Sequence, residues 1–263
     1  MNYEVHTTLQ PGHGEQLGRQ VREGEYDSLF VLGGDGTMSE VARGFIGSQV
    51  PVANFPCGSG NDLAGALGMS RDLAKSLDSL QPAEIAPIVL IRDCGTIYTE
   101  TIGTGFVAHV VDNVLKINRT IRGPAAYFAS VFKTLARFQP AHYKITVDNE
   151  HWQGEASLVI VNNNFRVGGG MRITPDAKLD DGILDVAIFK SSSKMTLLSL
   201  LPKVYTGGHV GSEHIIMLRG RSVKVESDRE LLKTADGDLV GKLPIDAEVI
   251  PQAMNFFRID RPE

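Results

Sequence analysis

The segments of this sequence best suited to chemistry are rich in glycine and carry acidic or hydroxyl side chains. The first, GGDGTMSE, runs from Gly33 to Glu40 and follows the apolar run 28–32. Glycines let a backbone approach a phosphate closely, and a helix that starts after such a turn presents free N–H groups to an anion. Thr37 and Glu40, three residues apart, fit a capping box at the start of that helix. Asp35 would repel a phosphate unless Mg²⁺ lay between them, so the segment indicates a metal–nucleotide site, with a plain tight turn as the alternative.

A second segment repeats this arrangement. PCGSGND at 56–62 follows the apolar run 50–55 and contains the Ser59 hydroxyl. Asn61 or Asp62 is expected to cap the helix that follows. Because neighbouring parallel strands end at the same edge of a sheet, both turns are expected to open toward one ligand.

Two further clusters lie in the second half of the sequence. The stretch 168–185, GGGMRITPDAKLDDGILD, contains adjacent carboxylates at Asp180 and Asp181. That arrangement is costly without a cation or good hydrogen bonds, although ordinary Asp-Gly turn chemistry explains it as well. Asp236-Gly237-Asp238 lies between two strand-like segments, where Asp-Gly is a common hairpin signal.

The elements that position these residues change character along the chain. The first third alternates strands and helices, as in a parallel α/β sheet, with strands expected at 3–7, 28–32 and 50–55 and helices at 15–22, 37–45 and 61–67. From about residue 84, strands separated by turns are typical of an antiparallel sandwich or barrel. These strands are expected at 88–91, 96–102, 143–147, 156–161, 184–189 and 222–225, and helices at 124–138 and 195–205. The predicted fold class is α/β plus β: an N-terminal parallel α/β nucleotide-binding domain at 1–86, then a C-terminal antiparallel β-sandwich-like domain at 87–263, with the active site in the cleft between them.

The composition is that of an ordinary globular protein with an excess of glycine. The 263 residues include 28 Gly, 42% are hydrophobic and 22% charged, and the formal net charge is −5. These values disfavour disorder and nucleic-acid binding. No apolar stretch approaches the length of a membrane span, and the first residues lack the pattern of a signal peptide. The sequence has two cysteines, Cys57 and Cys94, which is too few for a disulfide framework or a thiolate metal site. We therefore expect a soluble cytoplasmic protein.

Taken together, the clusters resemble the diacylglycerol kinase catalytic-domain family, in particular its small soluble bacterial lipid kinases. The matching stretches run in order along nearly the whole chain: GGDGTMSEV (33–41), PCGSGNDLA (56–64), GTGF (103–106), GGGMRITPDAKLDDGILDV (168–186) and DGD (236–238). As a set they are specific, whereas the GGDGT segment alone is similar to loops of NAD kinases and phosphofructokinases.

The resemblance implies roles for individual residues. ATP would be contacted by Thr8, Gly33, Gly34, Asp35, Gly36, Thr37, Met38, Ser39, Glu40, Gly58, Ser59, Gly60 and Asn61. Asp35 would also help to organise Mg²⁺ and phosphate. Asp238, at the last position of the family's usual DGE, would be the catalytic base. Asp181 and the backbone oxygens of Lys178 and Ile183 would form a second, structural Mg²⁺ site.

Three departures from the family pattern bear on activity. The family's usual first strand and its Asn-Pro-x-x-Gly-type turn are not in the printed sequence. Asp238 stands where Glu is usual, and a base about 1 Å out of place can cost much of a rate. Gly65 stands where the family often has Arg, so one cationic contact is expected to be lost.

The expected function is transfer of the ATP γ-phosphoryl group to a lipid hydroxyl, with diacylglycerol as acceptor and phosphatidic acid as product. The alternatives are an NAD-kinase-like phosphotransferase for a soluble acceptor and a nucleotide-binding protein with little catalytic activity. The expected partners are ATP, the lipid and a membrane surface contacted transiently, with no nucleic acid; a homodimer is also allowed.

A candidate membrane-facing helix supports the peripheral location that a lipid substrate requires. The stretch 119–138 combines basic and apolar side chains, as a helix at an anionic interface does: Arg119, Arg122, Lys133 and Arg137 with Phe128, Phe132, Leu135 and Phe138. The alternative is a core-packed helix with a solvated basic rim.

Overall fold

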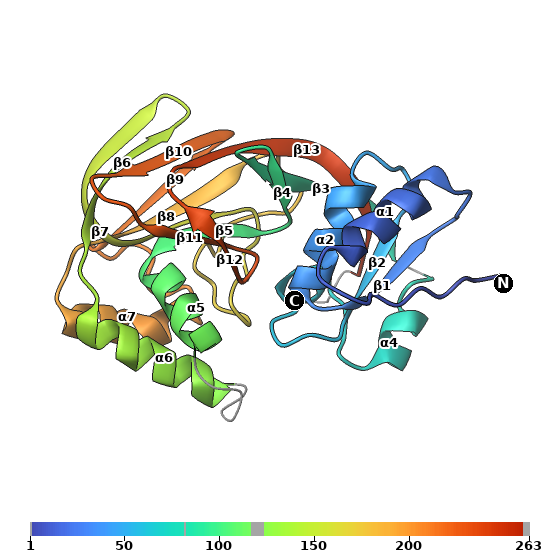
Figure 1. Ribbon diagram of the computed structural model, residues 1–263, viewed down its shortest axis with the longest axis horizontal. Coiled ribbons are helices and arrows are strands. Elements are labelled where there is room, and N and C mark those ends of the chain that lie inside the picture. The colour runs from blue at the N-terminus through green and yellow to red at the C-terminus, as the bar shows by residue number, and fades with distance from the viewer. Residues whose placement is uncertain (1, 82, 117–123, 260–263) are drawn as a thin grey trace.

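The chain folds into two lobes, shown in Figure 1, in a computed structural model that describes residues 2–81, 83–116 and 124–259. The first lobe contains α1 (His13–Glu23), β1 (Leu29–Gly33), α2 (Asp35–Phe45), β2 (Val52–Pro56), α3 (Asp62–Ala66) and α4 (Leu73–Asp78). β1 and β2 are parallel, and Gly33 lies opposite Pro56 where the two strands end. Both glycine turns therefore leave the same edge of the sheet, as the sequence predicts.

The second lobe is built mainly from antiparallel strands. In chain order it contains β3 (Glu84–Asp93), β4 (Thr96–Tyr98), β5 (Thr101–Gly105), α5 (Phe106–Lys116), α6 (Pro124–Arg137), β6 (Ala141–Val147), β7 (Glu150–Asn162), β8 (Leu184–Lys190), α7 (Lys194–Val204), β9 (Ile215–Gly220), β10 (Ser222–Ser227), β11 (Leu232–Ala235), β12 (Asp238–Lys242) and β13 (Ile245–Arg258). Buried and exposed positions alternate along β6 and β10, so one face of each strand is packed and the other is solvated. The predicted fold class is confirmed.

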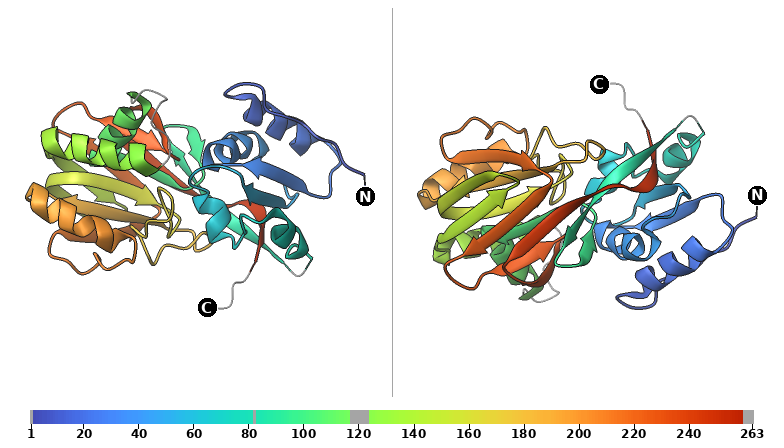
Figure 2. Two further views of the ribbon diagram at one scale, coloured as in Figure 1. Left: turned by 90° about the horizontal axis from the view of Figure 1, so that it is seen from below. Right: turned by 90° about the horizontal axis from the view of Figure 1, so that it is seen from above.

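One strand, β13, connects the two lobes. Among the described residues the strands belong to one sheet of thirteen, with the order β1-β2-β13-β10-β6-β7-β5-β11-β12; β3 and β4 branch from β13, and β8 and β9 branch from β7. β13 pairs antiparallel with β10 and β3, and it reaches β2 through Phe256 opposite Val52. Figure 2 shows this strand, in red, running from one lobe into the other.

Three clusters of buried apolar side chains form the core. One fills the first lobe around Met38, Phe45 and Phe55. A second lies among the strands of the second lobe around Tyr143. The third packs α5, α6 and α7 against the sheet around Phe189; Figure 2 shows these helices together on one face of the second lobe. Each large side chain buried in this way contributes about 1.5–3 kcal/mol. The core of the first lobe includes side chains of β3 and β13, so these strands join the two lobes through packing as well as pairing.

Most predicted elements are present with shifted ends, and the exceptions have physical reasons. The strand predicted at 3–7 is wrong, since this segment is exposed and pairs with no other described strand. The strand predicted at 96–102 is broken into β4 and β5, because the N–H groups of residues 99–101 donate to the Asp236 side chain instead of a neighbouring strand. α4, α5, β9 and β13 have no counterpart among the predicted elements. The domain boundary between residues 86 and 87 stays a prediction.

The predicted membrane-facing stretch is described only in part. Arg119, Arg122 and the Phe128 side chain lie outside the described residues. On α6, Lys133 is exposed and Phe132 is 57% exposed, whereas other side chains of the helix belong to the core. Of the helices described, none has the length and apolar character needed to cross a bilayer.

Candidate active site

The two glycine turns contact each other backbone to backbone. A Cβ built on Gly34 would lie 2.9 Å from the Gly58 Cα, and one built on Gly58 would lie 2.5 Å from the Gly34 Cα. A side-chain carbon cannot lie that close to a backbone atom, so both positions require glycine. The Cys57 N–H donates to the Gly33 carbonyl at 3.0 Å and fixes the second turn to the end of β1. The turns therefore form one continuous backbone surface.

Asn61 shapes the second turn. Its backbone is left-handed (φ 59°, ψ 43°), its Oδ1 accepts from the Gly58 N–H at 2.7 Å, and its Nδ2 donates to the Gly58 carbonyl at 2.6 Å. The Asn61 N–H donates to Asp35 Oδ2 at 2.7 Å, which links the second turn to the first. The predicted cap of α3 is wrong, because the Asn61 side chain closes the turn and Asp62 bonds elsewhere.

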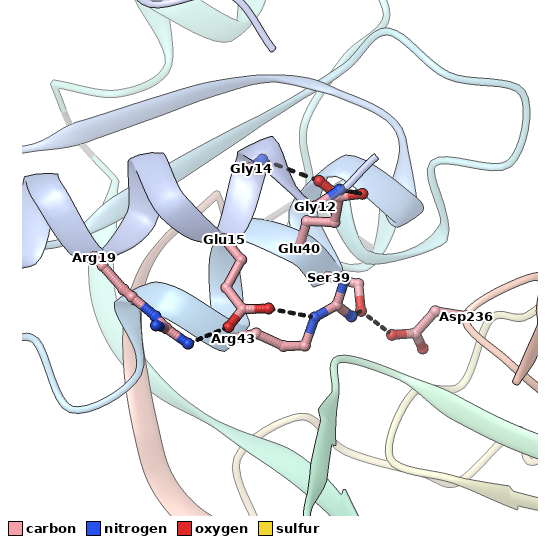
Figure 3. Close-up of polar contacts among 8 residues, drawn as sticks. All are labelled: Gly12, Gly14, Glu15, Arg19, Ser39, Glu40, Arg43 and Asp236. Carbon is pink, nitrogen blue, oxygen red and sulfur yellow. Dashed lines mark hydrogen bonds and ion pairs between the residues drawn. The ribbon is translucent and has the colours of Figure 1, made fainter. Parts of the chain in front are cut away.

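α2 begins at Asp35, directly after Gly34 and two residues earlier than predicted. The predicted capping box is wrong, because Glu40 accepts hydrogen bonds from the N–H groups of Gly12 (2.9 Å) and Gly14 (3.0 Å) at the start of α1, as Figure 3 shows. An acidic side chain is favourable there because it meets the positive end of the α1 dipole. The first turn of α2 has no side-chain cap, which leaves its N–H groups available to an anion.

Asp236 ties the second lobe to the first at this point. Its Oδ2 accepts from the Ser39 hydroxyl on α2 (2.7 Å; Figure 3) and from the Thr99 N–H (2.7 Å) and hydroxyl (3.0 Å). Its Oδ1 accepts from the N–H groups of Glu100 (3.0 Å) and Thr101 (3.1 Å). One carboxylate thus accepts hydrogen bonds from three backbone N–H groups and two hydroxyls. The predicted contact of Ser39 with the nucleotide would compete with the hydrogen bond from Ser39 to Asp236.

The β11–β12 hairpin brings Asp238 to α2. Asp236 and Gly237 form its two-residue turn with positive φ (45° and 89°), so the Asp-Gly hairpin signal is confirmed. Oδ2 of Asp238 lies 3.8 Å from the place of a Cβ on Gly36, in the first turn of α2. Although Asp238 is exposed overall, partial burial of its carboxyl raises the pKa of this group above its ordinary value, and the nearby Asp236 charge raises it further. A carboxylate placed there can accept a proton from a group bound at the start of α2.

Asp35, Asp62 and Glu100 bring three carboxyl groups together below the turns. A Cβ on Gly60 would lie 2.6 Å from Asp35 Oδ2 and 3.5 Å from Asp62 Oδ2, so these two carboxylates flank one glycine. Burial raises the pKa of Asp35, and the charge of Asp62 raises it further. Glu100 is only 3% exposed; burial, and then the charge of Asp35, raise its pKa well above its usual range. A positive charge bound here would relieve this repulsion.

The third glycine cluster reaches the site from the second lobe. Residues 168–170 all have positive φ (62°, 85° and 103°) in a turn closed by pairing of Val167 with Met171. Three consecutive residues follow such a path without strain only when they are glycines. The Gly169 N–H donates to Asp62 Oδ2 at 2.7 Å. The predicted cluster therefore makes a lobe-to-lobe contact with Asp62 at the candidate site.

Arg166, just ahead of this turn, is a site residue that sequence reasoning missed. Its Nε lies 4.0 Å from Asp62 Oδ1, and neither atom has a hydrogen-bond partner among the described residues. A Cβ on Gly65 would lie 3.0 Å from the Arg166 Cζ. A guanidinium from the second lobe therefore lies beside position 65, where a cationic contact was expected to be lost.

The carboxylates of the site fit a magnesium ion bound together with phosphate. Asp35 Oδ1 and Asp62 Oδ1 are buried without hydrogen-bond partners in the described part of the chain. Mg²⁺ is usually held by one or two carboxylates together with substrate phosphates. No three Asp, Glu, His or Cys side chains of the described residues are arranged to hold an ion by themselves, so a nucleotide would have to supply part of the coordination.

At the predicted second metal site, the Asp181 side chain makes a hydrogen bond and an ion pair within the protein. Asp181 Oδ1 accepts from the Ile183 N–H at 3.1 Å, and its Oδ2 contacts Arg219 at 2.6 Å. Arg219 also bonds Asp185 at 2.8 Å. Each Asp181 oxygen therefore has one protein partner, and a metal held there with the Lys178 and Ile183 carbonyls stays a prediction. The adjacent carboxylates thus have separate cations, Arg219 for Asp181 and Arg258 for Asp180 at 2.6 Å.

The other residues predicted to contact the nucleotide differ in how accessible their side chains are. Thr8 and Ser59 are exposed, ahead of α1 and in the second turn. The Thr37 side chain packs against Gly33, where a Cβ would lie 2.7 Å from the Thr37 Cβ. Met38 is fully buried and its N–H donates to the Gly34 carbonyl at 3.0 Å, so it is a core residue. The nucleotide contacts themselves stay predictions.

Family comparisons agree with this division into lobes. Residues 1–92 match the diacylglycerol kinase catalytic domain, and residues 100–258 match the YegS C-terminal NAD kinase β-sandwich-like domain. The chain therefore belongs to the family in which these two domains follow one another, and the predicted family is confirmed.

Individual relatives cover most of the chain. It is 28% identical over 243 residues to diacylglycerol kinase of Bacillus subtilis (strain 168), covering 91% of this chain and 80% of that protein. It is 28% identical over 239 residues to diacylglycerol kinase of Mycobacterium tuberculosis, covering 88% and 77%. A crystal structure of a diacylglycerol kinase from Bacillus anthracis str. Sterne superposes with a TM-score of 0.73 at 21% identity, over 97% of this chain and 84% of that one. The last comparison shows a shared fold.

Proposed function

We propose that this protein is an ATP-dependent lipid kinase that phosphorylates the hydroxyl of diacylglycerol to give phosphatidic acid. The observation that carries the proposal is the approach of Asp238 to Gly36, which brings a carboxylate to the uncapped start of α2. Two curated relatives named diacylglycerol kinase support the choice of acceptor.

In this proposal the two lobes divide the chemistry. The N–H groups of the first turn of α2, with the backbone of Gly34 and Gly58, bind phosphate oxygens. Mg²⁺, held by Asp35 and Asp62, would neutralise phosphate charge. Asp238 accepts the hydroxyl proton as the acceptor oxygen bonds to the γ-phosphorus and the bond to the ADP oxygen breaks. The raised pKa of Asp238 favours this role, since a base acts best when its pKa is near the working pH.

An apolar cavity in the second lobe supports a lipid acceptor. It has a volume of about 60 Å³ and lies between α5, α6, α7 and the sheet, lined by Phe106, Val107, Val110, Val131, Leu135, Leu158, Ile160, Met171, Ile173, Phe189, Leu197, Leu200, Leu201 and Val204. Leu115 and Phe132 are 62% and 57% exposed on α5 and α6. Exposed apolar side chains on these helices suit the transient membrane contact that a lipid substrate requires.

The acceptor is tested by offering labelled ATP and Mg²⁺ with diacylglycerol, sphingosine or NAD in separate reactions. We expect label in phosphatidic acid. Label only in NADP would refute a lipid acceptor, and tight Mg-ATP binding without turnover on any acceptor would identify a nucleotide-binding protein instead.

The base is tested by Asp238→Asn. This change should lower turnover by about 10²–10⁴-fold, the usual contribution of a well-placed general base, and leave ATP affinity nearly unchanged. Asp78→Asn on the exposed surface of α4 is the matched control. Full turnover by the Asp238 variant would exclude this carboxylate from the mechanism.

A further inference from the structure

A polar groove lies between α5, α6 and the segment that leads into β11. It has a volume of about 400 Å³ and shares no lining residue with the candidate active site. Its cationic lining residues are Lys133 and Arg137 of α6 and Arg229, which precedes β11. Because the chain as a whole carries a formal charge of −5, this concentration of positive charge is local to the groove.

Among the described residues, no side chain pairs with the cations of the groove. Lys133 and Arg137 have no ion pair or hydrogen bond within the described part of the chain. Arg229 donates to two backbone carbonyls, those of residues 139 (2.7 Å) and 140 (2.8 Å), which orient the guanidinium without cancelling its charge. Glu230, the acidic lining residue, is paired with Lys242 at 2.5 Å. About three positive charges are therefore available to a ligand.

His109 and Asn113 of α5 add hydrogen-bonding groups to the same groove. Asn113 is oriented by donating to the Thr134 hydroxyl at 2.9 Å, and the His109 ring contacts Phe138 at 5.9 Å between centroids. Burial lowers the pKa of His109; Asp112 opposes this effect, and the charges of Arg229 and Lys116 add to it. The α6 cations also line the groove. A bound anion would oppose the effect of Arg229 on the imidazole and raise its pKa.

We propose that this groove binds a phosphate group, as a phosphomonoester or phosphodiester, at a site separate from the nucleotide. Guanidinium and ammonium groups that line one groove from two elements match the tetrahedral oxygens of a phosphate. Arg137, unpaired within the described part of the chain, can bind a phosphate with two hydrogen bonds. A lipid headgroup or a soluble phosphate ester could supply that chemistry. The inference goes beyond the proposed kinase reaction and does not depend on turnover.

The soluble form of the ligand is tested by NMR titration of the His109 imidazole, assigned with His109→Gln, using inorganic phosphate and glycerol 3-phosphate. Both probes should raise the pKa of His109, because a nearby anion favours the protonated ring. The double variant K133Q/R137Q should lose the shift. K75Q/K203Q, which removes two exposed lysines elsewhere, should keep it. Unchanged ATP affinity in both double variants verifies their fold.

The source of the phosphate is tested by co-sedimentation with phosphatidylcholine vesicles that contain or lack phosphatidylglycerol. A lipid headgroup predicts about 30-fold weaker binding of K133Q/R137Q to the anionic vesicles, from the usual contribution of two cations at such a surface. A soluble ester predicts equal sedimentation of the two double variants while the His109 shift persists in the wild type. The proposal is overturned if phosphate leaves the His109 pKa unchanged or raises it equally in K133Q/R137Q. A vesicle effect without a phosphate effect would mean general adhesion and would overturn it too.

Discussion

Replacing Asp236 with alanine removes a carboxylate that connects α2 to the β4–β5 break. Two of the backbone donors it satisfies belong to buried residues, Thr99 (0% exposed) and Glu100 (3%). Each buried N–H left without a partner costs about 1–3 kcal/mol, so Asp236→Ala should destabilise the fold by roughly 4 kcal/mol. The hydroxyl of Ser39 can turn to another acceptor and adds less. In Asp236→Asn the remaining oxygen can keep the Glu100 and Thr101 donors while the amide faces the Thr99 N–H, so about half the loss is expected.

Thermal unfolding followed by circular dichroism measures the effect. For a chain of this length, 1 kcal/mol lowers the melting temperature by about 2–4 °C, so Asp236→Ala should melt roughly 8–16 °C lower and Asp236→Asn roughly 4–8 °C lower. Asp238→Ala is the matched control in the same hairpin, because the Asp238 side chain is exposed and only its carbonyl accepts a bond, from the Thr234 hydroxyl. If Asp236→Ala melts within about 2 °C of this control, the hydrogen-bond reasoning is refuted.

Three further predictions concern the same site. The melting temperature of Glu100→Gln should equal that of the wild type below pH 4.5 and exceed it increasingly at higher pH. The reason is that burial raises the folded-state pKa of Glu100, so the wild-type fold is destabilised as the pH rises toward that pKa. A difference in melting temperature that does not change with pH would contradict this. Gly58→Ala should lower the free energy of unfolding in urea by about 1–3 kcal/mol, since its Cβ would meet the Gly34 Cα. Gly36→Ala, whose Cβ would have no atom outside its own helix backbone nearer than 3.8 Å, should raise it by up to about 1 kcal/mol. Equal unfolding free energies for the two variants would contradict the close approach of the two turns. Arg166→Ala should weaken ATP binding about fivefold by calorimetry while Arg166→Lys keeps most of it, and an unchanged affinity would exclude Arg166 from the site.

Local patterns predicted the glycine turns well because their geometry depends on neighbouring residues. Gly33 to Gly36 and Gly58 to Gly60 follow apolar runs, and the backbone contact between the turns follows from parallel pairing of the strands. The capping box failed although its spacing was right, because the α1 amides compete for Glu40 and win through tertiary contact.

Long-range contacts explain what could not be predicted. Asp236 follows a sound hairpin signal, but its role depends on Thr99 and Ser39, which are far away in the sequence. Arg166 lies in a loop with no pattern that points to Asp62. Glu100 offered a usable signal, an acidic residue between threonines in a stretch expected to be a strand.

The path of β13 has a consequence for the order of folding during synthesis. Ala253, Met254 and Phe256 belong to the core of the first lobe, and Phe256 pairs with β2. Until these residues have left the ribosome, the first lobe lacks part of its core and β2 lacks a neighbour on that side, although its own helices were made long before. The lobe that contains the start of the chain is therefore completed last, after the second lobe has been synthesised, in contrast to the usual N-terminal-first order.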